Sequence, residues 1–153
     1  MSQNQKRLAK LGIDAINLLE KPINKALEKS ERFEGIESIY DIAKGAEKVV
    51  SIGNHTGEGW FLTGEMIELL NNGVKNIVCL QPFGCLPNHI VGKGMLKELR
   101  RQFKGANISP IDYDPGSSEV NQLNRIRLMM TTAKKCKKQI NQSNAIEKSS
   151  PRE

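Results

Sequence analysis

The sequence predicts a small three-layer α/β fold, in which a mainly parallel sheet of about three strands is flanked by helices and preceded by a helical N-terminal lead-in. Two observations predict this class. From Lys48 onward, short β-branched runs alternate with stretches of helical periodicity, the pattern of successive βα units. Asn72-Gly73 and Lys104-Gly105 then follow two of the helical stretches, at the place where glycine commonly closes a last helical turn.

The lead-in is expected to be helical from its apolar spacing. Apolar residues recur every three or four positions before Pro22, at Leu8, Leu11, Ala15, Leu18 and Leu19. Pro22 is expected to end or kink this helix, and a second helix is expected from Pro22 to about Ser30. A third, short helix is expected over Ile36 to Ala43.

The α/β part is expected to hold three βα units. The strands are expected at Val49 to Ile52, Asn76 to Leu80 and Ile108 to Tyr113, and the helices at Trp60 to Asn71, Asn88 to Phe103 and Ser117 to Lys134. Because crossovers between parallel strands are right-handed, the loops after the three strands should open on one edge of the sheet. The expected organisation is a lead-in over 1–47, an α/β domain over 48–134, and a frayed polar tail over 135–153.

Charge and hydropathy exclude two classes of partner. The net charge is +6, but from Lys134 onward six Lys or Arg face two Glu, so that +4 lies in the tail and +2 in the rest. No basic and aromatic residues interleave as in a nucleic-acid-binding surface. The chain also has neither a secretion signal nor an apolar run of membrane-spanning length, which predicts a cytoplasmic protein without a nucleic-acid or membrane partner.

The run from Gln81 to His89 is the most constrained loop of the sequence. It places Cys85 between Gly84 and Pro87, directly after an expected strand and before an expected helix. A thiolate near a helix N-terminus is stabilised by the helix dipole, so Cys85 is either a ligand or reactive thiol, or an inert loop residue. Of the other cysteines, Cys79 is expected to be a small buried hydrophobe and Cys136 a surface residue.

The loop from Gly53 to Gly59 has two open interpretations. Its glycines match neither the P-loop nor the dinucleotide-binding spacing. They either build a tight turn or let a ligand approach, and in the second case His55 and Glu58 are the groups able to do acid-base or coordination work. Asp112 and Asp114, after the last strand, are either supporting groups of a site at this edge or ordinary turn residues. His89 is either a functional residue or a helix cap.

Three segments together resemble a known family. The segments run from Gly53 to Trp60, from Gln81 to His89, and from Asp112 through Arg125. Over roughly 34–133 the chain resembles the C-terminal part of the acyl-CoA dehydratase activase-related proteins, relatives of the 2-hydroxyacyl-CoA dehydratases. The resemblance implies a module of an oxygen-sensitive iron–sulfur system of anaerobes, in which an ATP-driven activase supplies a low-potential electron.

The resemblance also implies a site. Cys85 matches a cysteine that would supply a metal ligand to a 4Fe–4S cluster, with His55, Gly57, Glu58 and Gly59 as the neighbouring cofactor-binding loop. The other thiolates would come from the remainder of a dehydratase-like or activase-like protein or from a homo-oligomer, and the substrate would be an acyl-CoA. The chain is not expected to be catalytic alone. The alternatives are a non-catalytic interaction or scaffold domain, and a nucleotide-binding or small-molecule-binding domain.

Overall fold

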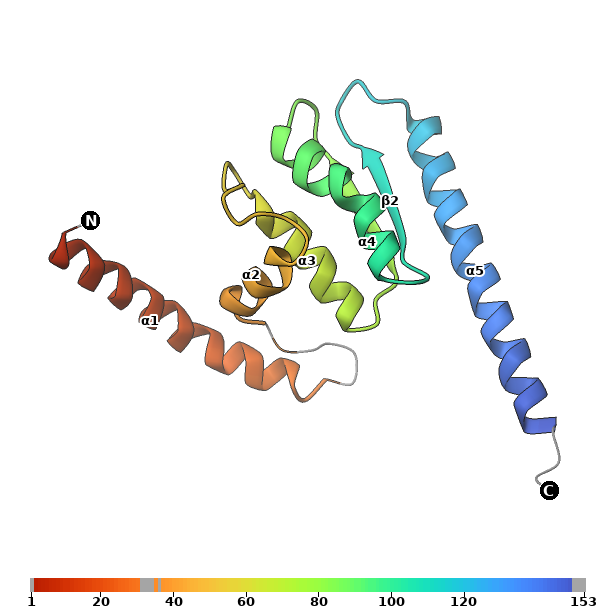
Figure 1. Cartoon of the computed structure of the whole chain (residues 1–153), viewed down its shortest axis with the longest axis horizontal. Coiled ribbons are helices and arrows are strands. Elements are labelled where there is room, and N and C mark those ends of the chain that lie inside the picture. Colours follow the sequence, from red (N-terminus) through yellow and green to blue (C-terminus); the bar gives the residue numbers. More distant parts are fainter. Residues whose placement is uncertain (1, 31–34, 36, 150–153) are drawn as a thin grey trace. The chain divides into compact units, whose positions relative to one another are not determined.

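The computed structural model describes residues 2–30, 35 and 37–149 and divides into two compact units, Met1–Ile39 and Tyr40–Glu153. The elements are α1 (Gln3–Leu27), α2 (Ile39–Glu47), α3 (Trp60–Asn71), β1 (Asn76–Gln81), η1 (Asn88–Gly92), η2 (Lys93–Met95), α4 (Leu96–Gln102), β2 (Asn107–Asp112) and α5 (Glu119–Ser149), shown in Figure 1. Most of α2 thus belongs to the α/β unit and not to the expected lead-in, because Ile42 and Ala46 are buried there.

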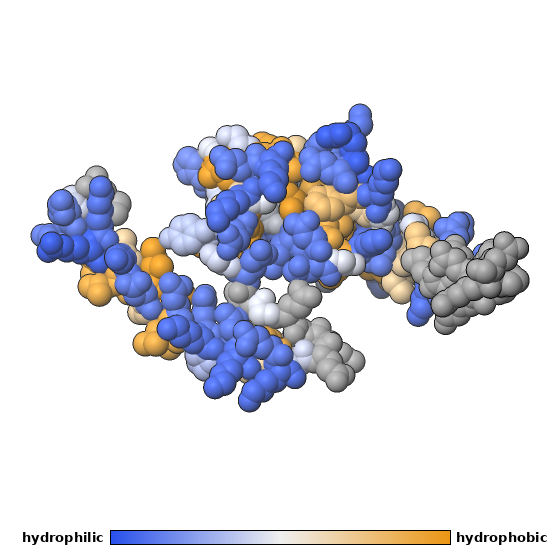
Figure 2. Space-filling model, turned by 60° about the horizontal axis from the view of Figure 1, so that its bottom comes forward, coloured by the Kyte–Doolittle hydropathy of each residue, from blue (hydrophilic) through white to orange (hydrophobic). Residues whose placement is uncertain are grey.

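The first unit consists mainly of α1, which is a single helix. Ser2 and Gln5 cap its N-terminus reciprocally, since each main-chain N–H bonds to the other residue's side chain. The helix does not end at Pro22, and no second helix begins there: α1 continues through Pro22 to Leu27, with helix formers on both sides of the proline. The apolar residues form one exposed side of α1, which Figure 2 shows in orange beside blue hydrophilic residues.

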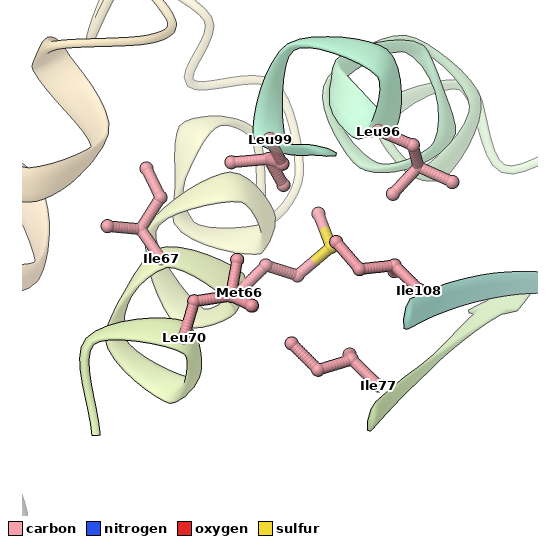
Figure 3. Close-up of a cluster of buried hydrophobic side chains, with 7 residues drawn as sticks. All are labelled: Met66, Ile67, Leu70, Ile77, Leu96, Leu99 and Ile108. Carbon is pink, nitrogen blue, oxygen red and sulfur yellow. The ribbon is translucent and has the colours of Figure 1, made fainter. Parts of the chain in front are cut away.

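The core of the second unit lies between one face of the sheet and two helices (Figure 3). Seven buried side chains form it: Met66, Ile67, Leu70, Ile77, Leu96, Leu99 and Ile108. They come from α3, β1, α4 and β2, so that each of these elements buries an apolar side against the others. A close contact joins α2 to α3, where a Cβ added at Gly64 would lie 2.6 Å from the side chain of Ile42.

The sheet is parallel, as predicted, but in the described residues it has two strands. β1 pairs with β2 in a register that sets Ile77 opposite Ile108 and Gln81 opposite Asp112. The predicted strand at Val49 to Ile52 is wrong. The main-chain N–H groups of Val49 and Val50 both donate to the carbonyl of Ala46 at 2.9 Å, which holds these residues in turns at the end of α2.

The helices lie on both faces of the sheet. α3 and α4 cover the face that carries Ile77 and Ile108 (Figure 3). On the other face, the Asn107 side chain donates to the Met129 carbonyl of α5 at 2.9 Å. The predicted helix over 88–103 is present as η1, η2 and α4, a π-helical turn and a 3-10 turn followed by an α-helix.

The polar segment after Lys134 is helical and not frayed, because α5 continues to Ser149. Lys, Gln and Ala are good helix formers, so a segment with no apolar face can still extend a helix that is already nucleated. Residues 150–153 lie outside the described residues. Within the described part of the chain, none of the helices combines the length and the apolar character that a membrane crossing requires.

Candidate thiol site at the carboxyl end of the sheet

The loop after β1 brings Cys85 to the start of a helical segment. Gly84 adopts a φ of 66°, and the turn closes with the N–H of Cys85 donating to the Pro82 carbonyl at 3.2 Å. Helical structure begins at Leu86, and the N–H of His89 donates to the Cys85 carbonyl at 3.2 Å. The predicted position of Cys85, between a strand and a helix N-terminus, is therefore confirmed.

The sulfur of Cys85 has a specific hydrogen-bond donor. Asn88 Nδ2 lies 3.0 Å from Cys85 Sγ, and Asn88 is buried, whereas the thiol is half-buried. Asn88 opens the π-helical turn η1, and such turns are frequent at functional sites. An amide N–H at this distance can also hydrogen-bond a sulfur that binds a metal.

A second thiol lies nearby on β1. Gln81 Nε2 donates to Cys79 Sγ at 3.1 Å, and burial raises the pKa of the Cys79 thiol, an effect that the Gln81 hydrogen bond partly offsets. Cys79 is half-buried, so it is more accessible than the predicted buried hydrophobe. Gly92 makes room for this group: a Cβ there would lie 3.6 Å from both Cys79 Sγ and Gln81 Nε2.

Gln81 has an unusual environment. Its side chain is 1% exposed, and its Oε1 has no hydrogen-bond partner among the residues that the structure describes. A buried amide oxygen without a donor costs about 1–3 kcal/mol. Sequence reasoning missed both Gln81 and Asn88. Gln81 lies two residues after Cys79 and four after Ile77, on the inward face of β1, so the two-residue period of the strand could have predicted its burial.

The Gly53 to Gly59 loop packs beside the Cys85 loop although no strand precedes it. A Cβ on Gly57 would lie 3.0 Å from Pro87, so only a glycine lets the two loops approach this closely. Gly59 has a φ of 55°, and a Cβ there would lie 2.1 Å from the carbonyl oxygen of Asn54. Both glycines therefore have structural roles in a loop that folds back on itself.

The polar candidates of this loop point to solvent. His55 Nδ1 lies 2.8 Å from the Gly53 carbonyl, which requires the proton on Nδ1 and leaves Nε2 as the acceptor of the neutral ring. His55 and Glu58 are both exposed. A pocket of about 110 Å³ lies between the two loops, lined by Asn54, Thr56, Gly59, Leu86, Pro87, Ile90 and Val91. Neither His55, Glu58 nor Cys85 is among the lining residues.

The loop after β2 opens on the same edge, as predicted, because Asp112 is the register partner of Gln81. Asp114 serves turn chemistry: its Oδ1 accepts from the N–H of Gly116 at 2.8 Å. Asp112 Oδ1 lies 4.0 Å from Lys93 Nζ, and His89 is exposed. Cys136 is exposed on α5.

The described residues thus bring together Cys79, Gln81, Cys85 and Asn88, with the Gly53 to Gly59 loop against Pro87. Nowhere in the described ranges do three His, Cys, Asp or Glu side chains form a group that could hold a metal ion. Comparisons of the chain with protein-family models, with curated protein sequences and with solved structures found no match.

Proposed function

We propose that this chain is a module of an iron–sulfur protein of the 2-hydroxyacyl-CoA dehydratase and activase type. In this proposal, the thiolate of Cys85 is one ligand of a 4Fe–4S cluster whose other ligands come from a second polypeptide segment. The observation that carries the proposal is the hydrogen bond from Asn88 Nδ2 to Cys85 Sγ at the start of a helical segment. Hydrogen bonds to ligand sulfur tune the potential of such clusters.

The residues fit one ligand position and no more. Cys85 supplies the soft, half-buried sulfur that iron–sulfur clusters require, held in a turn between Pro82 and Leu86. Cys79 is the second thiol at this edge of the sheet, but burial raises its thiol pKa and so disfavours the thiolate that iron binds. The remaining ligands would therefore come from outside the described residues.

The surroundings of Cys85 suit a site completed by another segment. Three large apolar side chains in the segment from Phe83 to Ile90, which contains Cys85, are exposed: Phe83 at 86%, Leu86 at 61% and Ile90 at 52%. Several exposed apolar side chains within one short segment are typical of a surface that another protein covers. Covering this surface would also exclude water from Cys85, which favours a cluster of low potential and protects it from oxidation.

The bound cluster would supply electrons at low potential to ATP-driven chemistry on an acyl-CoA. In the assembled site, Cys85 Sγ would bind one iron and Asn88 would orient that sulfur. The exposed loop that carries His55 and Glu58 would lie at the edge of the site. Catalysis would belong to the assembled protein in a reducing, cytoplasmic setting. The partner would be the remainder of a dehydratase-like or activase-like protein, or a further copy of the chain.

A second candidate is a non-catalytic interaction module, which the same exposed apolar residues favour. The nucleotide-binding alternative has less support, because the pocket beside the glycine loop is about 110 Å³, whereas small-molecule pockets are commonly about 300–1,000 Å³. The interaction module differs from the main proposal in one respect: it requires the apolar loop residues but not the sulfur.

The test is anaerobic reconstitution with iron and sulfide after the tagged chain is captured, together with its bound partners, from anaerobically grown cells. Cys85→Ser is expected to lose most of the iron and sulfide per chain, whereas Cys136→Ser, also a free cysteine, is expected to keep the wild-type content. Phe83→Ala should weaken capture of the partner. Equal iron in Cys85→Ser and wild type, with capture still lost in Phe83→Ala, would leave the interaction module and reject the cluster.

A further inference from the structure

The two edges of the sheet differ in how far side chains occupy their main-chain hydrogen-bonding groups. In the observed register, the main-chain groups of Ile108, Pro110 and Asp112 face the outer edge of β2. All three carbonyls accept side-chain hydrogen bonds, from Arg100, Arg125 and Gln122 respectively. Pro110 has no N–H, which removes a further donor from this edge. Side chains therefore block the outer edge of β2 against another strand.

β1 lacks this protection. The N–H of Asn107 donates to the Lys75 carbonyl, and that of Tyr113 donates to the Gln81 carbonyl. The main-chain N–H and C=O groups of the alternate residues Asn76, Val78 and Leu80 therefore face away from β2. Gln81 Nε2 reaches the Leu80 carbonyl at 3.3 Å. The main-chain N–H and C=O of Val78 have no hydrogen-bond partner within the described parts of the chain.

The side chains along this edge are apolar and uncovered. Val78 is 43% exposed and Leu80 51% exposed. An open groove of about 380 Å³ runs between β1 and α3, lined by Leu62, Glu65, Met66, Glu68, Leu69, Ile77, Val78, Cys79, Leu80 and Asn88. An uncharged edge strand without Pro or Lys among its outward residues is a template for strand addition.

We infer that β1 pairs with β1 of a second copy of this chain, antiparallel and with Val78 on the two-fold axis. In that register Asn76 faces Leu80 of the other copy and Val78 faces Val78, so every outward main-chain group finds a partner. The result is a continuous four-stranded sheet whose only outer edges are the two blocked edges of β2.

The residues along the shared edge allow two copies to pair in this register without electrostatic repulsion. The three outward residues carry no charge, so no like charges meet across the axis. Strand alternation sets Lys75 of one copy opposite Gln81 of the other, on the face that Ile77 shares and that α3, the helix of Glu65, covers. Glu65 forms no ion pair among the described residues, and burial raises the pKa of its carboxyl, a cost that an incoming ammonium offsets. This inference does not depend on the proposed function.

The test is the mass of the full-length chain in solution, measured by sedimentation equilibrium over a range of concentrations under reducing conditions. The wild type is expected to dimerise, and Val78→Lys to weaken the dimer at least tenfold, because it sets two ammonium groups on the axis. Val120→Lys on α5, also an exposed valine, should dimerise as the wild type does. A monomeric wild type, or a dimer that Val78→Lys leaves intact, would overturn the inference.

A cross-link provides the second measurement. In a chain whose native cysteines are replaced by Ala, Val78→Cys should form an intermolecular disulfide on mild oxidation, since register partners in antiparallel strands lie within disulfide reach. Leu128→Cys, on an exposed part of α5, is the matched control and should remain monomeric. Equal cross-linking of the two variants would contradict a two-fold axis at Val78.

Discussion

Asn88 Nδ2 and Cys85 Sγ lie 3.0 Å apart, with the amide buried and the thiol half-buried. The contact spans less than one turn at the start of a helical segment, so the fold of the loop itself fixes it. Cys136, by contrast, is exposed on α5.

Removing the donor should slow the chemistry of the sulfur. We expect Asn88→Leu to reduce the rate of Cys85 alkylation by iodoacetamide about three- to fivefold, because a hydrogen bond of about 1.5 kcal/mol to the reacting sulfur is lost, and the higher nucleophilicity of the freed sulfur offsets about half of that effect. Peptide mass spectrometry would follow each cysteine separately. Cys136 in the same sample is the internal control and should keep its rate. Equal Cys85 rates in variant and wild type would show that the amide does not act on the sulfur.

The close approach at Gly59 predicts a large loss of stability on adding one methyl group. Gly59→Ala should lower the free energy of unfolding by about 2–4 kcal/mol, because the new Cβ would overlap the Asn54 carbonyl and the φ is positive. Gly45→Ala, inside α2 and with ordinary contact distances, should leave stability unchanged or raise it by about 0.5–1 kcal/mol. Urea denaturation of both variants measures this difference, and similar midpoints would contradict it.

The blocked edge of β2 predicts opposite outcomes for two adjacent arginines. Arg100 donates to the Ile108 carbonyl, so Arg100→Met should cost about 1–2 kcal/mol by leaving that acceptor unpaired. Arg101, which is itself exposed, forms an ion pair with the partly exposed Glu98, so Arg101→Met should change stability little. Thermal unfolding of the pair is the measurement. Equal losses of stability in the two variants would show that the hydrogen bond from Arg100 to the Ile108 carbonyl does not stabilise the fold.

Glu98 should make stability depend on acid pH. Hydrogen bonds from Arg101, and then from Gln102, lower the pKa of its carboxyl from 4.5 to about 2. A carboxyl whose pKa is lower in the folded chain stabilises the fold above its ordinary pKa and loses that contribution as the pH falls through the lowered value. Wild type should therefore have a higher melting temperature than Glu98→Gln at pH 6, by a small margin because solvent reaches the ion pair through the exposed Arg101, and the two should converge near pH 2. A margin that does not change with pH would contradict this assignment.

The sequence predicted those elements whose ends carry local signals. The helix over Trp60 to Asn71 was predicted to the residue, because Asn72 and Gly73 end it and Gly73 adopts a φ of 82°. The parallel direction of the strands at Asn76 and Ile108, and the gathering of their loops on one edge, were also predicted, whereas the order of the strands was not. These features follow from periodicity and from the handedness of crossovers.

The wrong predictions concern segments for which local pattern is ambiguous. Val49 and Val50 form a short apolar run, which suits a strand as well as a buried turn, and the Ala46 carbonyl decides the outcome. The Lys-rich and Gln-rich segment after Lys134 has a composition shared by disordered chains and by exposed helices. Residue type alone could not identify Asn88 as the Cys85 donor, because that contact depends on the π-helical turn.

The most direct test of the central claim is differential alkylation of the cysteines in the anaerobically captured, iron-loaded assembly, before and after a chelator removes the iron. Iron-bound thiolates are protected from alkylation. The account predicts that Cys85 is labelled only after chelation, whereas the exposed Cys136 is labelled at the same rate in both states. Labelling of Cys85 at one rate before and after removal of the iron would contradict its role as a ligand.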